Sequence, residues 1–230
     1  MNISHEKKFI FVSVQKTASV SIRMNLRGFS DIGSDQKFKD PQPPHLMINQ
    51  IKEKFFPNND DVFNSYFKFA FVRNPWDRMV SWYKFFSKEI NRYESGEPCI
   101  GMRRIVEKHP LQGQTNVSVY DIYKYYSSMS FKDWIKYEYD KKSSYYLGGY
   151  GRYFEDKNGN NLMNFIGKIE NLQQDFDFAC DKIGIPRQKL EVRNFTVHDH
   201  YSEYYDDQTQ QIIAEAYEKD IKNFGYKFEK

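Results

Sequence analysis

The chain is short of the features that mark disulfide-rich, secreted and membrane-spanning proteins. It has only 2 cysteines among 230 residues, Cys99 and Cys180, with no CxxC pair and no histidine at zinc-finger spacing. Two distant cysteines are too few for a disulfide scaffold and indicate reduced thiols. The N-terminal apolar run is too short for a signal peptide and is typical of a strand, and no apolar run approaches the length that spans a bilayer. These absences predict a cytoplasmic protein.

The chain also lacks an excess of charge of either sign. Its 34 basic and 31 acidic residues leave a net charge of +3. Non-specific binding to nucleic-acid phosphates needs a strong basic excess, so the composition argues against a nucleic-acid partner but remains compatible with one concentrated anion site. Aromatic residues, in contrast, make up 18% of the chain, with 20 Phe and 18 Tyr. Their rings predict a large buried area, and the tyrosine hydroxyls are suited to polar ligands.

Length and pattern predict one α/β domain over residues 1–230. Hydrophobic residues are 40% and charged residues 28% of the chain, which is an ordinary globular composition. Apolar, β-branched and aromatic runs predict strands over residues 8–14, 67–72 and 165–169. Helical spacing occurs over residues 18–27, 45–56, 172–183 and 207–224, after Asn74 and Pro75, and twice between residues 119 and 139. This alternation predicts a mostly parallel sheet flanked by helices, with an irregular insertion around residues 92–162.

Two strand-to-helix junctions are the candidate ligand sites, because ligands of parallel sheets bind beyond the carboxyl ends of the strands. At the first junction a helix opens with an ammonium and three hydroxyls, from Lys16, Thr17, Ser19 and Ser21. Together with the amides and the positive dipole end of a helix N-terminus, these groups predict an anion cradle. The Walker pattern GxxxxGK[ST] is absent. The alternative is an ordinary capped helix in which Lys16 stands by chance.

The second junction follows the apolar run FKFAFV and begins with Arg73. A charge at the end of a buried strand is costly without an anionic partner. Asn74 and Pro75 are suited to the N-cap and first position of a helix, and Ser81 lies eight residues after Arg73 on that helix. The guanidinium and the hydroxyl are therefore placed to share one phosphate. The alternative is that Arg73 pairs with an acid such as Asp77 while Ser81 faces solvent.

Both junctions resemble motifs of one enzyme family. The segment FVSVQKTASVSI, residues 11–22, resembles the 5′-phosphosulfate loop of sulfotransferases, above all of the carbohydrate branch with its Golgi-type and bacterial members, whose loop reads PKTAGTS or PKTASTS. The segment FAFVRNPWDRMVSWY, residues 69–83, is similar to their 3′-phosphate motif, in which an Arg and a Ser eight positions later hold the 3′-phosphate of the donor. Residues 166–176 and 198–228 also resemble later blocks of bacterial members. The resemblance is weak between residues 92 and 162.

The resemblance implies the sulfotransferase fold, a P-loop NTPase-like parallel sheet, and the donor 3′-phosphoadenosine 5′-phosphosulfate (PAPS). Transfer of a sulfuryl group depends mainly on positioning and on charge stabilisation. The family motifs imply that Arg73 and Ser81 hold the 3′-phosphate and that Lys16 is catalytic, because it stabilises the charge on the leaving oxygen. The residues that they assign to the 5′ end of the donor are Gln15, Lys16, Thr17, Ala18, Ser19, Val20 and Ser21. No carboxylate cluster resembles a magnesium site, so no metal is expected.

One position departs from the family pattern. Gln15 stands where the family usually has a proline just before the lysine. A proline stiffens the loop, so Gln15 is expected either to loosen it or to add a side-chain donor. Because the Lys, Thr and Ser positions are kept, we expect the loop to be tuned rather than lost.

A general base is needed to deprotonate an acceptor hydroxyl. We predict His45, which opens a helix between the two motifs and lies in the stretch where the resemblance implies a catalytic histidine. The alternative is a histidine with only a capping or packing role. His198 and His200 form an H-x-H in a polar loop without a third metal ligand, so a lid or donor-contact role is expected there.

Three further features have two interpretations each. Arg78 either reinforces the field around the 3′-phosphate or pairs with Asp77. Glu170 either contacts the nucleotide or is an acid favoured at a helix start. The tyrosines between residues 120 and 153 either form a wall for the acceptor or simply pack.

These observations predict a sulfotransferase that moves the sulfuryl group of PAPS to a hydroxyl of an acceptor, by analogy a carbohydrate. A donor-binding protein without transfer activity is one alternative. A P-loop small-molecule kinase is another, and it would need magnesium and a Walker lysine context. The expected partners are the nucleotide donor and a hydroxyl-bearing glycan or small molecule. The sequence identifies neither the acceptor nor the oligomeric state.

Overall fold

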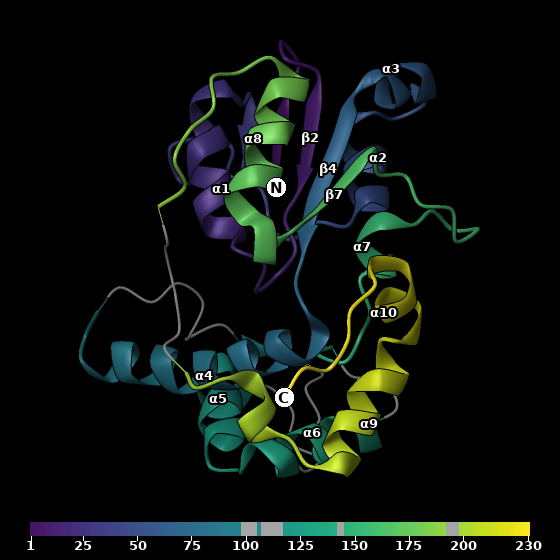
Figure 1. Ribbon diagram of the computed structural model, residues 1–230. Helices are drawn as coiled ribbons and strands as arrows, with labels where there is room; N and C mark the ends of the chain where they lie inside the picture. Colours follow the sequence, from purple (N-terminus) through teal and green to yellow (C-terminus); the bar gives the residue numbers. More distant parts are fainter. Residues whose placement is uncertain (98–104, 107–116, 142–144, 192–197) are drawn as a thin grey trace. The chain divides into compact units, whose positions relative to one another are not determined.

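The computed structural model of the chain describes residues 1–97, 105–106, 117–141, 145–191 and 198–230. The chain divides into two compact units, and each is described by itself (Figure 1). The sheet unit consists of Met1–Arg73 and Gly149–Phe195, and the helical unit of Asn74–Gly148 and Thr196–Lys230. The single domain expected over the whole chain stays a prediction.

The sheet unit is built on a mixed sheet with a parallel core. Its five strands within the described residues follow the order β3-β1-β2-β4-β7. Their bounds are Asn2–Ser4 (β1), Phe9–Val12 (β2), Ile32–Gly33 (β3), Phe67–Val72 (β4) and Phe165–Lys168 (β7). β4 is parallel to β2 and β7, whereas β1 is antiparallel to β2 and β3. The predicted α/β fold is confirmed, but β1 and β3 are too short for a sequence period to predict them.

Phenylalanines form the centre of the core on one face of this sheet. Two from β2 and two from β4 pack together with no exposed surface: Phe9, Phe11, Phe69 and Phe71. They share a face because side chains alternate along a strand. Helices α1 (Ser19–Leu26) and α8 (Leu172–Ile183) cover that face (Figure 1). As predicted, Gly184 terminates α8 as its C-cap, and its φ of 67° is a left-handed conformation that suits glycine.

Helices α2 (Ile48–Phe55) and α3 (Asp60–Ser65) lie on the opposite face (Figure 1). Lys68 of β4 points toward them, since its Nζ lies 5.0 Å from the centre of the Phe63 ring and donates to the Tyr66 carbonyl at 2.8 Å. The remaining short elements of the sheet unit are η1 (Arg27–Phe29), α7 (Gly151–Phe154) and η2 (Ile169–Asn171).

The helical unit is built around the long helix α4 (Pro75–Glu94). Its other described elements are β5 (Ile105–Val106), β6 (Val117–Ser118), α5 (Val119–Ser127), α6 (Phe131–Asp140), η3 (Tyr201–Tyr204), α9 (Asp207–Ala216) and α10 (Glu218–Phe224). Helices α5 and α6 confirm the two short helices predicted between residues 119 and 139. Buried rings from this unit pack edge to face: Trp82, Phe86, Tyr126, Trp134 and Tyr146. No helix among the described residues is both long and apolar enough to cross a membrane.

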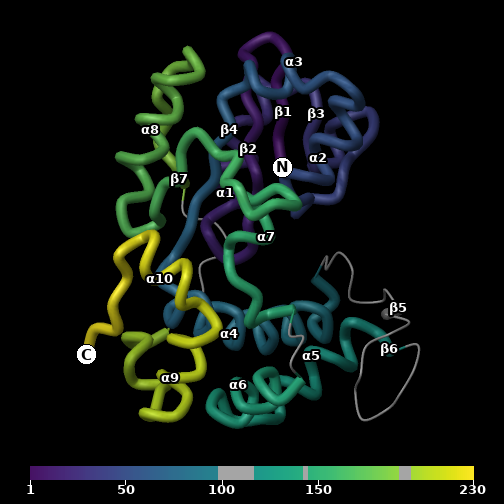
Figure 2. The backbone as a smooth tube through the Cα atoms, turned by 90° about the vertical axis from the view of Figure 1, so that its right-hand side faces the viewer, coloured from purple at the N-terminus to yellow at the C-terminus, as the bar shows by residue number. Residues whose placement is uncertain are grey.

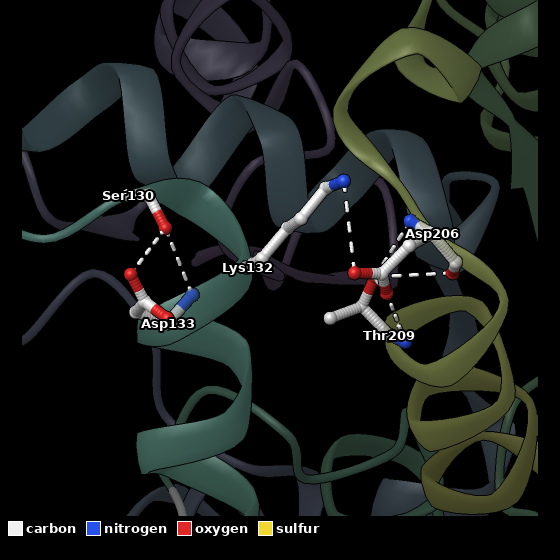
Figure 3. A network of polar contacts seen from close by, with 5 residues as sticks. All are labelled: Ser130, Lys132, Asp133, Asp206 and Thr209. Carbon is white, nitrogen blue, oxygen red and sulfur yellow. Dashed lines mark hydrogen bonds and ion pairs between the residues drawn. The ribbon is translucent and has the colours of Figure 1, made fainter.

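Side-chain caps fix where two helices of this unit begin (Figure 3). The Ser130 hydroxyl accepts from the Asp133 amide at 3.2 Å at the start of α6. The Asp206 carboxylate accepts from the Thr209 amide at 2.8 Å at the start of α9. Lys132 Nζ lies 3.6 Å from Asp206 Oδ2 and so links the two helix starts. Caps of this kind contribute about 0.5–2 kcal/mol each.

Two predicted helices differ from the structure. The helix expected over residues 45–56 begins at Ile48, so His45 lies in the preceding loop rather than in the first turn. The single helix expected over residues 207–224 is wrong, because the chain breaks at Tyr217 (φ −119°, ψ 20°) between α9 and α10. Tyr217 is 1% exposed, and its hydroxyl donates to a backbone carbonyl at 2.9 Å. That distant contact is not visible in a helical period.

Candidate functional site

The carboxyl ends of β2 and β4 lie side by side at one edge of the sheet. Val12 of β2 pairs with Ala70 of β4 in a parallel ladder. Gln15 follows Val12 by three residues, and Arg73 follows Ala70 by three residues. Gln15 and Arg73 therefore each lie three residues beyond the same ladder pair of neighbouring strands.

The first junction has an unusual backbone. Lys16 and Ala18 have φ of 65° and 54°, whereas Thr17 between them is not in the left-handed region. Such alternation turns successive amides toward one point and forms a concave nest for an anion. A left-handed conformation costs an L residue roughly 1–2 kcal/mol, and this loop has no glycine to relieve it. Strain of this kind is typical of ligand sites.

Helix α1 begins directly after this nest. Its N-cap Ala18 makes no side-chain capping hydrogen bond, and the first turn has no acidic side chain. The amides at the start of α1 therefore continue the nest as a cradle whose polarity suits a phosphate or sulfate. Ser19 and Ser21 are buried in this first turn, while Lys16 and Val20 are half-buried. The structure thus brings together the residues predicted for the 5′ end of the donor.

Two side chains hold the loop in this conformation. The Thr17 hydroxyl donates to the Val14 carbonyl at 3.1 Å, and Thr17 has no exposed surface. The hydroxyl of Tyr153, which belongs to α7, donates to Oε1 of Gln15. Gln15 is 8% exposed, so this bond is shielded from water. The position that usually carries proline therefore uses a side-chain acceptor to attach the loop to α7.

The second junction is fixed through its main chain. Arg73 is half-buried, and the hydroxyl of Tyr150 bonds both of its backbone polar groups. The hydroxyl donates to the Arg73 carbonyl at 2.7 Å and accepts from the Arg73 amide at 3.2 Å. Tyr150 has no exposed surface. The backbone from which the guanidinium extends is therefore held by two hydrogen bonds.

The residues after Arg73 belong to the helical unit. Asn74 caps α4 as predicted, because its Oδ1 accepts from the Trp76 amide at 3.0 Å and from the Asp77 amide at 3.5 Å. Ser81 on α4 is 3% exposed, so the alternative in which it faces solvent is wrong. Arg73 and Ser81 lie in different units, and their joint hold on one phosphate stays a prediction.

His45 is half-buried and is oriented by the strand end. Its Nδ1 lies 2.8 Å from the Ser13 carbonyl oxygen. Only a protonated Nδ1 donates to a carbonyl, so the lone pair of the neutral ring is on Nε2. Ser13 Oγ also accepts from Arg23 Nη1 at 3.0 Å. Burial lowers the pKa of Arg23 to about 10, and the nearby Asp35 opposes that shift.

The H-x-H pair lies in the helical unit. His198 Nε2 is 3.7 Å from Asp77 Oδ1, and His200 Nδ1 is 2.9 Å from Ser202 Oγ. Across the described ranges, no group of three or more His, Cys, Asp and Glu side chains is placed to hold a metal ion. The lid role of the pair stays a prediction.

The three ambiguous features are resolved in part. Arg78 has no exposed surface and donates from Nη1 to the Tyr217 hydroxyl at 2.7 Å, a contact that neither interpretation includes. Glu170 is exposed in the first turn of η2, where a helix start favours an acid. Tyr126 and Tyr146 are buried, and burial raises the pKa of both hydroxyls above the ordinary range of tyrosine. For these two tyrosines the packing interpretation is correct.

The sequence did not single out four residues of this region. Ser13 and Arg23 orient His45 and its surroundings, and Tyr150 and Tyr153 hold the two junctions. The pattern YGRYF, two tyrosines three residues apart on one helical turn, was the available signal. It was hidden in a segment rich in tyrosine throughout.

Comparisons with known proteins agree with the motifs at the two junctions. The family model described as "Sulfotransferase family" matches residues 1–227. An uncharacterized protein of Archaeoglobus fulgidus is 26% identical over 163 residues, which cover 69% of this chain and 96% of that protein. No solved structure matches the chain.

Proposed function

This chain belongs to the sulfotransferase family, and from that premise we propose that it transfers a sulfuryl group from PAPS to an acceptor hydroxyl. Family membership supports sulfuryl transfer in general, while the donor and the acceptor hydroxyl are our assignment. One observation carries the assignment: a strained anion nest at Lys16–Ala18 opens α1 beside Arg73 on the neighbouring strand end. PAPS has two separated anionic ends, which suits two neighbouring cationic junctions.

We assign the 5′-phosphosulfate of the donor to the first junction. Its amide donors would come from the nest and the first turn of α1: Thr17, Ala18, Ser19 and Val20. The hydroxyls of Ser19 and Ser21 would add two further donors. Thr17 contributes its amide, because its hydroxyl proton is already donated to Val14. Lys16 supplies the positive charge.

We assign the 3′-phosphate to Arg73, with Ser81 as its second donor. A guanidinium presents parallel N–H groups that fit two phosphate oxygens at once. ADP and adenylyl sulfate lack this phosphate, so the second junction would distinguish PAPS from both. The fixed backbone of Arg73 favours this use, since a held main chain reduces the freedom of the side chain.

We assign the role of general base to His45. When bound, PAPS supplies the sulfuryl group, and the bond from sulfur to the 5′-phosphate oxygen breaks as the acceptor oxygen bonds to sulfur. His45 Nε2 takes the proton of the acceptor hydroxyl, and the Ser13 carbonyl holds the ring in that tautomer. Lys16 and the nest amides stabilise the negative charge that develops on the leaving phosphate oxygen.

A carbohydrate acceptor is proposed by analogy with the branch that the motifs resemble. A cytoplasmic location also stays a prediction. A donor-binding protein without transfer activity is the second candidate, because the features that carry the donor assignment are all binding features.

Titration calorimetry of the wild-type chain with adenosine 3′,5′-bisphosphate and with ADP tests the donor. We expect tighter binding of the bisphosphate, and tighter binding of ADP would overturn the assignment in favour of a kinase. Transfer of labelled sulfate from PAPS to a panel of sugars and small alcohols then tests the activity. Bisphosphate binding without transfer by the wild type to any acceptor would favour the binding protein.

A further inference from the structure

The short helix α7 has two buried tyrosines, Tyr150 at its N-cap and Tyr153 within it, and each reaches one of the two junctions. Tyr150 bonds the backbone of Arg73, at 2.7 Å to its carbonyl and 3.2 Å from its amide. Tyr153 donates to the side chain of Gln15. They are 0% and 2% exposed, so neither hydrogen bond competes with water. All four residues belong to the sheet unit.

The geometry of α7 matches the spacing of the strands that it touches. Tyr150 has helical backbone angles, and the Tyr153 amide donates to the Tyr150 carbonyl at 2.9 Å, so the two side chains are three residues apart on one turn. Side chains three apart on a helix are about 5–6 Å apart at Cβ. Neighbouring strands lie about 4.7–4.9 Å apart. Because Gln15 and Arg73 each follow the last ladder pair of β2 and β4 by three residues, and the two tyrosines reach them, one helical turn spans the gap between the junctions.

The helix is itself anchored away from the two junctions. Asn49 of α2 donates from Nδ2 to the carbonyl of Glu155, which follows α7, at 2.8 Å. The ribbon and tube views both place α7 beside α2 (Figures 1 and 2). The two tyrosines therefore extend from a short helix that α2 of the sheet unit holds in place.

We propose that Tyr150 and Tyr153 form a tyrosine clamp, a pair of positioning residues that fixes the spacing between the two junctions. The clamp acts beyond Val12 and Ala70, the last ladder pair of β2 and β4. At Gln15 the clamp supplies the restraint that a proline gives in the corresponding loop of the sulfotransferase family. The ligand that benefits, a nucleotide with 3′- and 5′-phosphates, rests on the proposed function.

Hydrogen–deuterium exchange of the ligand-free protein tests the clamp without any nucleotide. Tyr153→Phe and Tyr150→Phe keep the rings and remove one hydroxyl each. We expect faster exchange over residues 13–21 in the first variant and around residues 72–75 in the second. Tyr66→Phe is the matched control, because it also removes a buried hydroxyl of the sheet unit, one bonded to His5 at 2.7 Å. Exchange at both junctions no faster than in this control would overturn the clamp.

Affinity measurements then test whether the two tyrosines act together. Loss of either hydroxyl should weaken adenosine 3′,5′-bisphosphate binding about 2–10-fold, the usual effect of one hydrogen bond. If the clamp fixes spacing, losing one end already frees it, so the double variant should bind within about 2-fold of the weaker single variant. If the loss of affinity in the double variant equals the product of the two single losses, the tyrosines are independent anchors, and the clamp is overturned.

Adenosine 5′-phosphate separates the clamp from the proposed function. It occupies one junction only, so Tyr150→Phe should leave its affinity unchanged while Tyr153→Phe weakens it. Equal losses from both variants would indicate a general structural defect and contradict the clamp. If the wild type binds no adenine nucleotide, the proposed function fails, and the exchange experiment still decides whether the clamp exists.

Discussion

Replacing Gly167 with alanine tests how closely β7 packs on β4. Gly167 pairs with Phe71 in the parallel ladder between these strands. A Cβ at Gly167 would lie 2.6 Å from Cε1 of Phe71 and 3.0 Å from Cβ of Asp175. Real Cβ atoms essentially never approach another heavy atom to 2.6 Å, so the neighbours would have to move.

These neighbours have little room to move. The Phe71 ring has no exposed surface and contacts the rings of Phe11 and Phe165, at centroid distances of 6.5 and 6.4 Å. Asp175 is held because its Oδ2 accepts from the Lys168 amide at 2.6 Å. Overpacking costs about 1–3 kcal/mol, and replacing a glycine returns about 0.4–1 kcal/mol through the unfolded chain. We therefore expect a net loss of roughly 1–2 kcal/mol, which corresponds to a melting temperature about 2–8 °C lower.

Differential scanning calorimetry measures this change. Gly28→Ala is the matched control, because a Cβ at Gly28 meets nothing within 4 Å and its backbone is not left-handed. That variant should melt at or above the wild-type temperature. If Gly167→Ala has the same melting temperature as Gly28→Ala, the close approach of β7 to β4 is wrong. The close packing of α8 against Gly167 is then wrong as well.

Four further predictions test single side chains. Lys16→Ala should lower kcat more than donor affinity, because its contact strengthens as charge develops; a loss of affinity alone would contradict that role. Arg73→Ala should weaken bisphosphate binding by roughly 2–4 kcal/mol in calorimetry, and unchanged affinity would count against the second junction. His45→Ala should slow transfer by about 10²–10⁴-fold without loss of bisphosphate affinity, whereas wild-type turnover would remove it as the base. Burial raises the pKa of Cys180 from 9.0 to about 11, so the unfolded thiol ionises first. Wild type should therefore lose stability relative to Cys180→Ala in urea titrations as the pH rises from 9.0 to about 11, and a constant difference would refute the burial.

The sequence predicted the elements that begin or end next to a capping residue or a helix-terminating glycine. The strand over residues 67–72 and the helix over 172–183 have the bounds that the sequence predicted. In both cases the decisive chemistry lies next to the element: Asn74 accepts from amides two and three residues ahead, and Gly184 takes the left-handed angle at a helix end. Such interactions need no distant partner, so the sequence carries them in full.

The sequence did not predict the elements that depend on contacts with distant residues. β1 exists because it pairs with β2 and β3, not because its own residues favour a strand strongly. The break between α9 and α10 lies at Tyr217. The hydroxyl of Tyr217 accepts a hydrogen bond from Arg78 and donates one to the Tyr146 carbonyl, and these residues lie 139 and 71 positions away in the sequence. The spacing of apolar residues predicts which face of a helix is buried. It does not predict which residue forms the hydrogen bond that a buried hydroxyl needs.

The candidate site shows the same division. Its charged and hydroxyl residues follow from two local motifs, and the structure places the residues of the first motif on one loop and the first turn of α1. The left-handed angles at Lys16 and Ala18 could not be predicted, because non-glycine residues rarely adopt them. Tyr150 and Tyr153 act on residues 77 and 138 positions away, a separation at which one sequence offers no signal.

The cost of the left-handed loop bears on how the donor would be bound. The loop has the nest conformation, and Thr17 and Tyr153 hold it there through partners within the protein. These hydrogen bonds offset part of the strain at Lys16 and Ala18, so they would preorganise that backbone for an anion. Since the Tyr153 hydroxyl contacts Gln15, affinity lost in Tyr153→Phe would measure preorganisation of the loop rather than a missing contact to the nucleotide.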